Sequence, residues 1–181
     1  MKRDEAITRL RAARRELQDA LAGLIQEDML RPNAVNHWSL KDLLAHIASW
    51  DEEQLRVIQA FAMQPEPQYA YTISDRNDFG SWNEAEIQLR KSRTLQQILS
   101  EFENARRDLI QVVEGVTDQV LQRPKTTSWG KQLTGLELLD EEAEHDIEHA
   151  KDIRSWRKKR ERWARARQKY VSKRRESRAR Q

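Results

Sequence analysis

Apolar residues recur every three or four positions along most of this chain, which is the spacing that places them on one face of an α-helix. Three such stretches cover residues 3–27, 39–61 and 94–114. A fourth begins at Thr134, and its apolar positions become sparse after Trp163. The pattern therefore predicts an all-α protein with four long helices whose apolar faces meet in one core.

Polar residues that can cap a helix stand at the start of three of these stretches. Each is followed three residues later by a side chain that can accept a hydrogen bond from the backbone at the cap, which is typical of a helix start. The pairs are Ser39 with Asp42, Thr94 with Gln97, and Thr134 with Glu137.

The segments between the predicted helices differ in length. Residues 64–81 contain two of the four prolines and Gly80, and they form a long connection by the usual standard. A long connection between the second and third helices of a four-helix bundle predicts a crossover rather than a tight hairpin. Residues 82–93 are expected to form a short helix or the approach to the third helix. Residues 117–133 are expected to form a loop with a single helical turn near its start.

The composition excludes several kinds of protein. The chain has no cysteine, so it cannot form a disulfide, a zinc–thiolate site or a protein thiol nucleophile. No stretch approaches the roughly 18 consecutive apolar residues of a membrane span, and the opening sequence MKRDEAITRL lacks the apolar core of a signal peptide. We therefore expect a cytoplasmic protein in which any thiol chemistry uses a thiol carried by a small molecule.

Charge is distributed very unevenly along the chain. Residues 151–181 hold 15 lysines and arginines against three acidic residues, a net charge of +12. Residues 1–150 hold 18 against 27, a net charge of −9. We expect residues 1–157 to form the bundle and residues 158–181 to form a basic C-terminal extension that is helical or partly disordered.

The basic segment also contains aromatic residues. Trp156, Trp163 and Tyr170 are spaced by seven residues, which would align them along one side of a helix. Such a surface suits nucleic acid, an anionic membrane or an acidic partner. The favoured interpretation is a solvated extension that packs back on the acidic body or is partly disordered, with nucleic acid as a less favoured partner.

Three of the four histidines form the main candidate for chemistry. His145 and His149 are four residues apart in the fourth predicted helix, so their side chains point the same way about 5–6 Å apart. His46 lies on the apolar face of the second predicted helix and can meet them in the core. Three imidazoles around one divalent metal leave a coordination position open, which is typical of a catalytic site. The spacing alone leaves open the alternative of a chance histidine pair and a core histidine.

Residues near these histidines are candidates for supporting roles. Asp42 and Glu142 lie four and three residues before a candidate ligand, and either carboxylate could accept a hydrogen bond from a ligand imidazole. The alternative is that both are exposed helical acids. Trp50, Trp82 and Trp129 are candidates for lining a substrate pocket, against the alternative that they pack in the core or in loops.

Two segments around the histidines resemble the motifs of a known family. Residues 38–51, WSLKDLLAHIASWD, resemble the second-helix motif of the DinB/YfiT-like superfamily, and residues 144–154, EHDIEHAKDIR, resemble its fourth-helix motif. The segment from Trp82 to Leu95 is similar to members with a W-N-x-A sequence before the third helix. The resemblance covers roughly residues 5–157, so the basic segment is a departure from the family.

The resemblance implies a four-helix bundle with a crossover, a homodimer, and one divalent metal, most often nickel or zinc, bound by His46, His145 and His149. It also implies an activity like those of thiol-dependent S-transferases and isomerases, or of hydrolases that open reactive electrophiles. We therefore expect a metal-dependent enzyme that acts on an electrophilic small molecule by hydrolysis or by transfer of a low-molecular-weight thiol. The alternative is a non-catalytic bundle that binds or sequesters a metal or a reactive metabolite.

Overall fold

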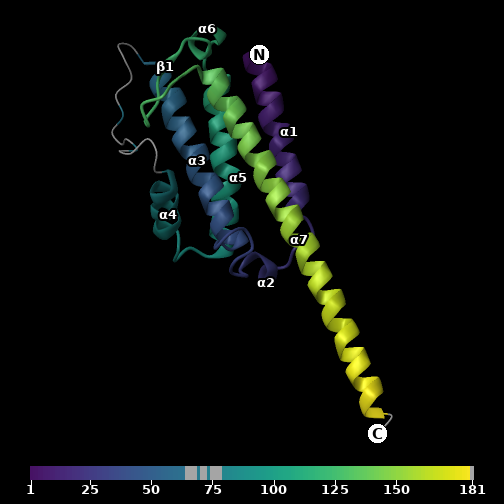
Figure 1. Ribbon diagram of the computed structural model, residues 1–181. Helices are drawn as coiled ribbons and strands as arrows, with labels where there is room; N and C mark the ends of the chain where they lie inside the picture. The colour runs from purple at the N-terminus through teal and green to yellow at the C-terminus, as the bar shows by residue number, and fades with distance from the viewer. Residues whose placement is uncertain (64–68, 70–72, 74–78, 180–181) are drawn as a thin grey trace.

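The computed structural model describes residues 1–63, 69, 73 and 79–179, with side chains as far as Ser172. These residues form a bundle of helices with a small hairpin at one end (Figure 1). The long helices are α1 (Arg3–Leu21), α3 (Leu40–Phe61), α5 (Leu95–Glu114) and α7 (Gly135–Ala179). The short elements are α2 (Gln26–Met29), α4 (Phe79–Leu89), α6 (Asp118–Leu121), β1 (Lys125–Thr126) and β2 (Gln132–Leu133).

The four long helices form the four-helix bundle that the apolar pattern predicts. α1 packs along α7 and α3 packs along α5, while α3 also contacts α7 (Figure 1). Large apolar side chains are completely buried where the helices meet, and each contributes roughly 1.5–3 kcal/mol of transfer free energy. Those from α1, α3 and α5 include Leu10, Leu17, Leu43, Ile47, Ile98 and Leu109.

A polar layer divides this core into two apolar clusters. One cluster lies at the end of the bundle where α1 begins, and the other lies at the end where α1 stops. Between them lie buried charged side chains from all four long helices, namely Arg14, Asp51, Arg106, Glu142 and Asp146.

The three predicted helix starts are confirmed. In each, the cap hydroxyl accepts a hydrogen bond from the backbone N–H three residues later, and the side chain at that later position accepts one from the cap N–H. The two distances are 3.1 and 3.1 Å for Ser39 and Asp42, 3.2 and 2.7 Å for Thr94 and Gln97, and 3.1 and 2.7 Å for Thr134 and Glu137.

The first helix is shorter than the predicted residues 3–27. It ends at Leu21, and Gly23 follows with a φ of 76°, a left-handed conformation that a right-handed helix cannot continue through. The separate one-turn helix α2 then begins at Gln26. Leu24 continues the apolar spacing of α1 in the sequence, and this extended the prediction past the true end of the helix.

Residues 117–133 contain more structure than the expected loop. The expected turn is α6, and β1 and β2 then form a hairpin in which Thr126 pairs with Gln132. Strands of two residues are too short to show an alternating pattern in the sequence. The short helix expected within residues 82–93 is α4, which begins earlier, at Phe79. Most of the connection at residues 64–81 lies outside the described residues, and the crossover stays a prediction.

The last helix, α7, is much longer than the bundle. Its last fully buried residue is Ile153, and Arg160 still pairs with Asp28 at the end of the bundle. From Glu161 to Ser172 every residue is exposed, and Figure 1 shows the helix projecting away from the other elements. The extension was expected either to pack back on the acidic body or to be partly disordered. As far as Ser172 it does not pack back, because one continuous helix carries it outward. Although α7 is long, no described helix is both long and apolar enough to cross a lipid bilayer.

Candidate metal centre

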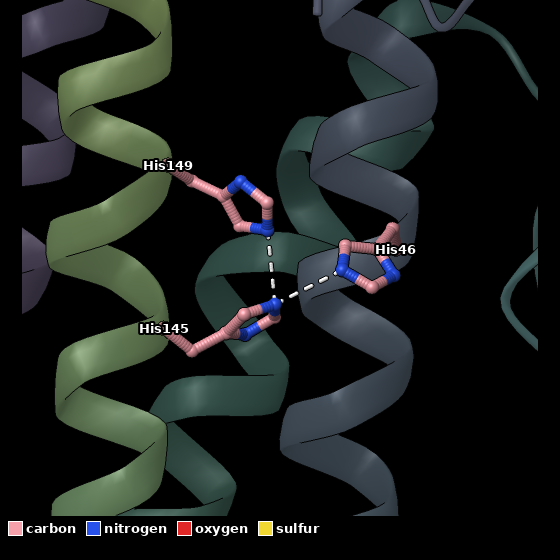
Figure 2. A group of neighbouring side chains, drawn as sticks. All are labelled: His46, His145 and His149. Atoms are coloured by element: carbon pink, nitrogen blue, oxygen red, sulfur yellow. Dashed lines mark hydrogen bonds between the residues drawn. The ribbon is translucent and has the colours of Figure 1, made fainter. Parts of the chain in front are cut away.

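Three histidines from two helices converge at one point in the bundle (Figure 2). His46 comes from α3, and His145 and His149 come from successive turns of α7. The Nε2 atom of His145 is 2.9 Å from Nε2 of His46 and 2.9 Å from Nε2 of His149. One ring nitrogen from each residue lies within 4.8 Å of the other two. The fourth histidine, His37, is exposed and contacts Glu84 instead.

The helices place these side chains by simple geometry. The four-residue spacing puts His145 and His149 one above the other on the side of α7 that faces α3 (Figure 2). His46 is only 4% exposed, because it shares the inward face of α3. The ring of Trp38 packs against the His46 imidazole, with ring centroids 4.9 Å apart, and fixes its position from the other side.

Carboxylates orient two of the three imidazoles from behind. Oε1 of Glu142 lies 3.7 Å from Nδ1 of His145, and Oδ2 of Asp152 lies 3.2 Å from Nδ1 of His149. A proton on each Nδ1 leaves each Nε2 with a lone pair directed at the cluster. Sequence reasoning did not single out Asp152, although it stands three residues from a candidate ligand just as Glu142 does.

The other acid singled out in the sequence, Asp42, serves the start of α3 instead. Its Oδ2 accepts hydrogen bonds from the backbone N–H and the hydroxyl of Ser39, and its Oδ1 lies 3.3 Å from Nζ of Lys91. Nδ1 of His46 has no hydrogen-bond partner among the described residues. The structure therefore does not bring Asp42 and His46 into a hydrogen bond, because the cap holds the carboxylate at the helix end.

Burial and mutual repulsion keep two of the three imidazoles neutral. Burial lowers the pKa of His46 from 6.5 to about 2, and charge repulsion from His145 and His149 adds to this shift. Burial lowers the pKa of His149 to about 4, and charge repulsion from His145 adds to this shift. Burial also acts to lower the pKa of His145, but the nearby carboxylate of Glu142, followed by those of Asp146 and Asp51, outweighs burial and raises this pKa above its ordinary value. Neutral imidazole is the form that binds a metal, so the proton on His145 is the main competitor.

The arrangement of the nitrogens fits a divalent cation. With its Nδ1 proton directed at Glu142, neutral His145 presents a single lone pair at Nε2, and this atom faces two other Nε2 atoms at 2.9 Å. One proton can bridge only one of these contacts at a time, so the other brings two lone pairs together. A central cation removes this repulsion. Zinc–nitrogen bonds of about 2.0–2.1 Å place ligand nitrogens about 3.3 Å apart, between the 2.9 Å of the two His145 contacts and the 4.8 Å within which all three nitrogens lie.

Glu142, the carboxylate behind one of the imidazoles, belongs to the polar layer of the core. It accepts a hydrogen bond of 3.1 Å from Nη2 of Arg106. Arg106 also contacts Asp51 at 2.7 Å and Asp146 at 3.0 Å, and Arg14 contacts the same two acids at 2.7 and 2.9 Å. None of these five side chains is more than 6% exposed, so the layer is shielded from solvent.

This layer contains three carboxylates and only two guanidinium groups. Burial acts to raise the pKa of Asp51, but Arg106 and Arg14 lower it below its ordinary value. Burial raises the pKa of Glu142, although the nearby imidazole of His145 opposes the shift. Glu142 is therefore the acid of the layer whose charged form is least stabilised, and a cation held by the three nitrogens would stabilise that charge.

A cavity of about 650 Å³ opens directly onto the histidine cluster. Aromatic side chains from Trp38, Trp50, Phe79 and Trp129 form one part of its wall, and polar or charged side chains form another, namely Gln54, Asn83, Lys131, Glu141 and Glu142. The ring centroid of Trp50 is 5.4 Å from that of Phe79 and 5.8 Å from that of Trp129. Of the tryptophans singled out in the sequence, Trp50 and Trp129 line the cavity. Trp82 is buried and does not line it, and its ring centroid lies 4.4 Å from that of Trp50.

The sequence relates the chain to one family across most of its length. The profile of the DinB superfamily matches residues 9–153, which include parts of all four long helices and all three histidines of the cluster. The chain belongs to the DinB superfamily. No curated protein matches its sequence.

Solved structures share the fold of this DinB protein at low sequence identity. Mycothiol-dependent maleylpyruvate isomerase has a TM-score of 0.70 and 15% identity, with 84% of this chain and 61% of the isomerase covered. The colibactin self-resistance protein ClbS, in complex with a dsDNA, has a TM-score of 0.69 and 14% identity, with 87% and 96% covered. TT2238, a four-helix bundle protein, has a TM-score of 0.58 and 20% identity, with 84% and 98% covered. These likenesses show the fold alone, and this chain spans only about three fifths of the isomerase's length.

Proposed function

We propose that this DinB protein is a metal-dependent enzyme that acts on an electrophilic small molecule, by hydrolysis or by transfer of a low-molecular-weight thiol. One observation carries the proposal: three imidazole nitrogens converge on a point that opens onto a cavity of about 650 Å³. A structural metal site is closed by a fourth protein ligand. Among the described residues, no fourth histidine or carboxylate joins the cluster.

His46, His145 and His149 would hold one divalent metal, for which nickel and zinc are the expected ions. When bound, the metal lowers the pKa of a water or thiol at its open position, so that the nucleophile is available near neutral pH. Glu142 and Asp152 hold the Nδ1 protons of their imidazoles, which keeps both rings turned toward the metal. The homodimer implied by the family resemblance stays a prediction.

The cavity wall supports an apolar and planar substrate. Trp50, Phe79 and Trp129 supply aromatic surface beside the histidines, and such surface binds aromatic or conjugated groups by stacking. Asn83 adds an amide that accepts a hydrogen bond of 2.9 Å from the indole of Trp50. The chain has no cysteine, so a thiol nucleophile would be a cosubstrate. The shared fold with a mycothiol-dependent isomerase supports this possibility.

Metal analysis of protein purified without an affinity tag tests the site. The native chain should carry close to one equivalent of a divalent metal, and His149→Ala should lose most of it because one of three ligands is gone. His37→Ala is the matched control, since this histidine is exposed and lies outside the cluster. If His149→Ala keeps its metal, or if both variants lose it equally, the assignment of the site is wrong.

Turnover assays separate an enzyme from a binding protein with the same fold. The metal-loaded protein should consume members of a panel of aromatic and conjugated electrophiles, and comparison with and without added thiol distinguishes transfer from hydrolysis. Stoichiometric binding without turnover across the panel would favour a bundle that sequesters a reactive metabolite.

A further inference from the structure

The C-terminal extension carries charge that the proposed function does not use. Residues 158–181 contain 12 lysines and arginines and only two glutamates. α7 continues through this segment to Ala179 as one helix. All of residues 161–172 are exposed, and Figure 1 shows the helix standing clear of the bundle. The cations at these positions therefore face solvent and are available to a partner.

We propose that this helix binds double-stranded DNA by lying in the major groove. An α-helix with its side chains is about 10–12 Å across, and the major groove of B-DNA, about 12 Å wide, admits one. Residues 158–179 extend over about 33 Å at 1.5 Å per residue, which is roughly one turn of the duplex. The extension thus has the width, length and charge that this groove accepts.

The cations are distributed as a groove requires. At 3.6 residues per turn, Arg162 and Lys169 lie to one side of the line through Trp163 and Tyr170, and Arg167 lies to the other side, so both walls of the groove would meet positive charge. A helix that lies on a membrane needs a broad apolar face instead. Here the apolar line is narrow, because Lys159 and Arg167 border Trp163 closely.

Two aromatic side chains stand on this narrow line. Trp163 is 77% exposed and Tyr170 is 66% exposed, and their spacing of seven residues places them on the same side. In the groove this side would face the base edges, where apolar groups contact thymine methyls. The net charge of −9 on residues 1–150 repels DNA, so only a helix that carries its cations beyond the bundle can make the contact.

The proposal is tested by fluorescence anisotropy with the full chain and a labelled 20-base-pair DNA duplex over a range of salt concentrations. The test variant replaces four exposed cations of the extension with glutamine: Arg162, Arg165, Arg167 and Lys169. The control variant makes the same change at four exposed arginines of the bundle: Arg15, Arg31, Arg107 and Arg123. Both variants have the same net charge, so only the position of the charge differs between them.

The test variant should bind the duplex at least about tenfold more weakly at 0.1 M salt, and the control should stay within about twofold of the native chain. Each lost phosphate contact should lower the slope of log affinity against log salt by about 0.9, or about three to four in total. Equal binding by the two variants would overturn the proposal, as would no duplex binding by the native chain.

Other polyanions decide whether the groove itself is used. Double-stranded RNA should bind more weakly, because its major groove is too deep and narrow for side chains to read. Equal affinity for RNA and DNA, or extension-dependent binding to phosphatidylserine vesicles without DNA binding, would also overturn the proposal. Helix content measured by circular dichroism should be the same in both variants, which shows that neither substitution unfolds the chain. The amount of bound metal is measured separately, because it reports on the proposed site in the bundle and not on the extension.

Discussion

Replacing Glu142 with glutamine tests whether the polar layer and the proposed metal site act together. Glutamine keeps the length of the side chain and an oxygen that can accept the Nδ1 proton of His145, but it removes the negative charge. That charge lies 3.7 Å from His145, and the Glu142 side chain that carries it is only 3% exposed. At an effective dielectric constant near 20, two unit charges at this distance interact with an energy of about 4 kcal/mol. Only part of this energy differs between the metal-bound and the metal-free protein. Loss of such a carboxylate behind a ligand typically weakens metal binding about 10- to 100-fold.

Two measurements report the change. Competition with a chromophoric chelator should show metal affinity lower by about 10- to 100-fold, which corresponds to about 1.4–2.7 kcal/mol. At a fixed free metal concentration well above the dissociation constant, the stabilisation by metal falls by the same free energy. The metal-induced rise in melting temperature should therefore shrink by about 3–11 °C for a chain of this size.

The neighbouring acid provides the control. Glu141→Gln removes the same charge one residue away, but this side chain is exposed and pairs with Lys131 at 3.0 Å rather than with a histidine. Its metal affinity should match that of the native chain within about twofold. If Glu142→Gln behaves like Glu141→Gln while both variants stay folded, the carboxylate does not act on His145 as the structure indicates.

Three further predictions concern stability and the cavity. Asp51→Asn should lower the free energy of unfolding by about 3–5 kcal/mol in urea titrations at pH 7, because two buried guanidinium groups each lose a charged partner. Asp108→Asn, at a half-exposed position, should change the free energy of unfolding by no more than about 0.5 kcal/mol. Similar losses in both variants would count against the layer. The pKa of Asp51 in the native chain lies below its pKa in the unfolded chain, which is near 3.9. The stability that Asp51 contributes is therefore complete above about pH 3.9 and is lost as pH falls through the native pKa, so the free energy of unfolding should drop below about pH 4. The same stability at pH 3 and pH 7 would refute this. Trp50→Ala should weaken binding of 1-naphthol about three- to tenfold, measured by fluorescence quenching. Trp163→Ala, in the exposed extension, should leave that binding unchanged, and an equal loss in both would mean that the probe does not occupy the cavity.

Much of the bundle is predictable because its signals are local. Helical spacing of apolar residues and the three capping pairs depend on neighbours within four positions, and the structure confirms these helix starts. The end of α1 was misplaced because the apolar spacing runs on to Leu24, whereas the left-handed conformation of Gly23 ends the helix first. The β1–β2 hairpin leaves no periodic signal at all, since each of its strands has two residues.

The meeting of the histidines could be anticipated, but their surroundings could not. His145 and His149 lie on one face of a single helix, and the apolar positions around His46 mark it as inward. Which acid stands behind which imidazole depends on rotamers and on how the helices are rotated. Asp42 is bonded to the start of its own helix, while Asp152, half-exposed at the surface, reaches Nδ1 of His149.

The polar layer shows most clearly what sequence patterns conceal in a chain with 35% charged residues. Arg14 stands four residues after Leu10 and three before Leu17, which is an inward position, yet it is flanked by other charged residues and resembles a solvated side chain. Its burial becomes evident only when Asp51 and Asp146 from other helices are seen to meet it at 2.7 and 2.9 Å. Inward positions occupied by arginine or aspartate on several helices are therefore the signal that could have revealed the layer.

Stability alone does not account for this layer, because removing buried charges from water costs as much as their pairing returns, and apolar side chains of similar size often serve as well. What apolar side chains cannot do is hold a carboxylate 3.7 Å behind His145. Arg14 and Arg106 neutralise two of the three acids, and Arg106 fixes the third, Glu142, by a hydrogen bond of 3.1 Å. The third carboxylate is thereby placed beside the imidazole whose Nε2 lies 2.9 Å from Nε2 of both of the others. If the three histidines hold a metal as proposed, the layer is best explained as the part of that proposed site that makes the core itself favour a cation there.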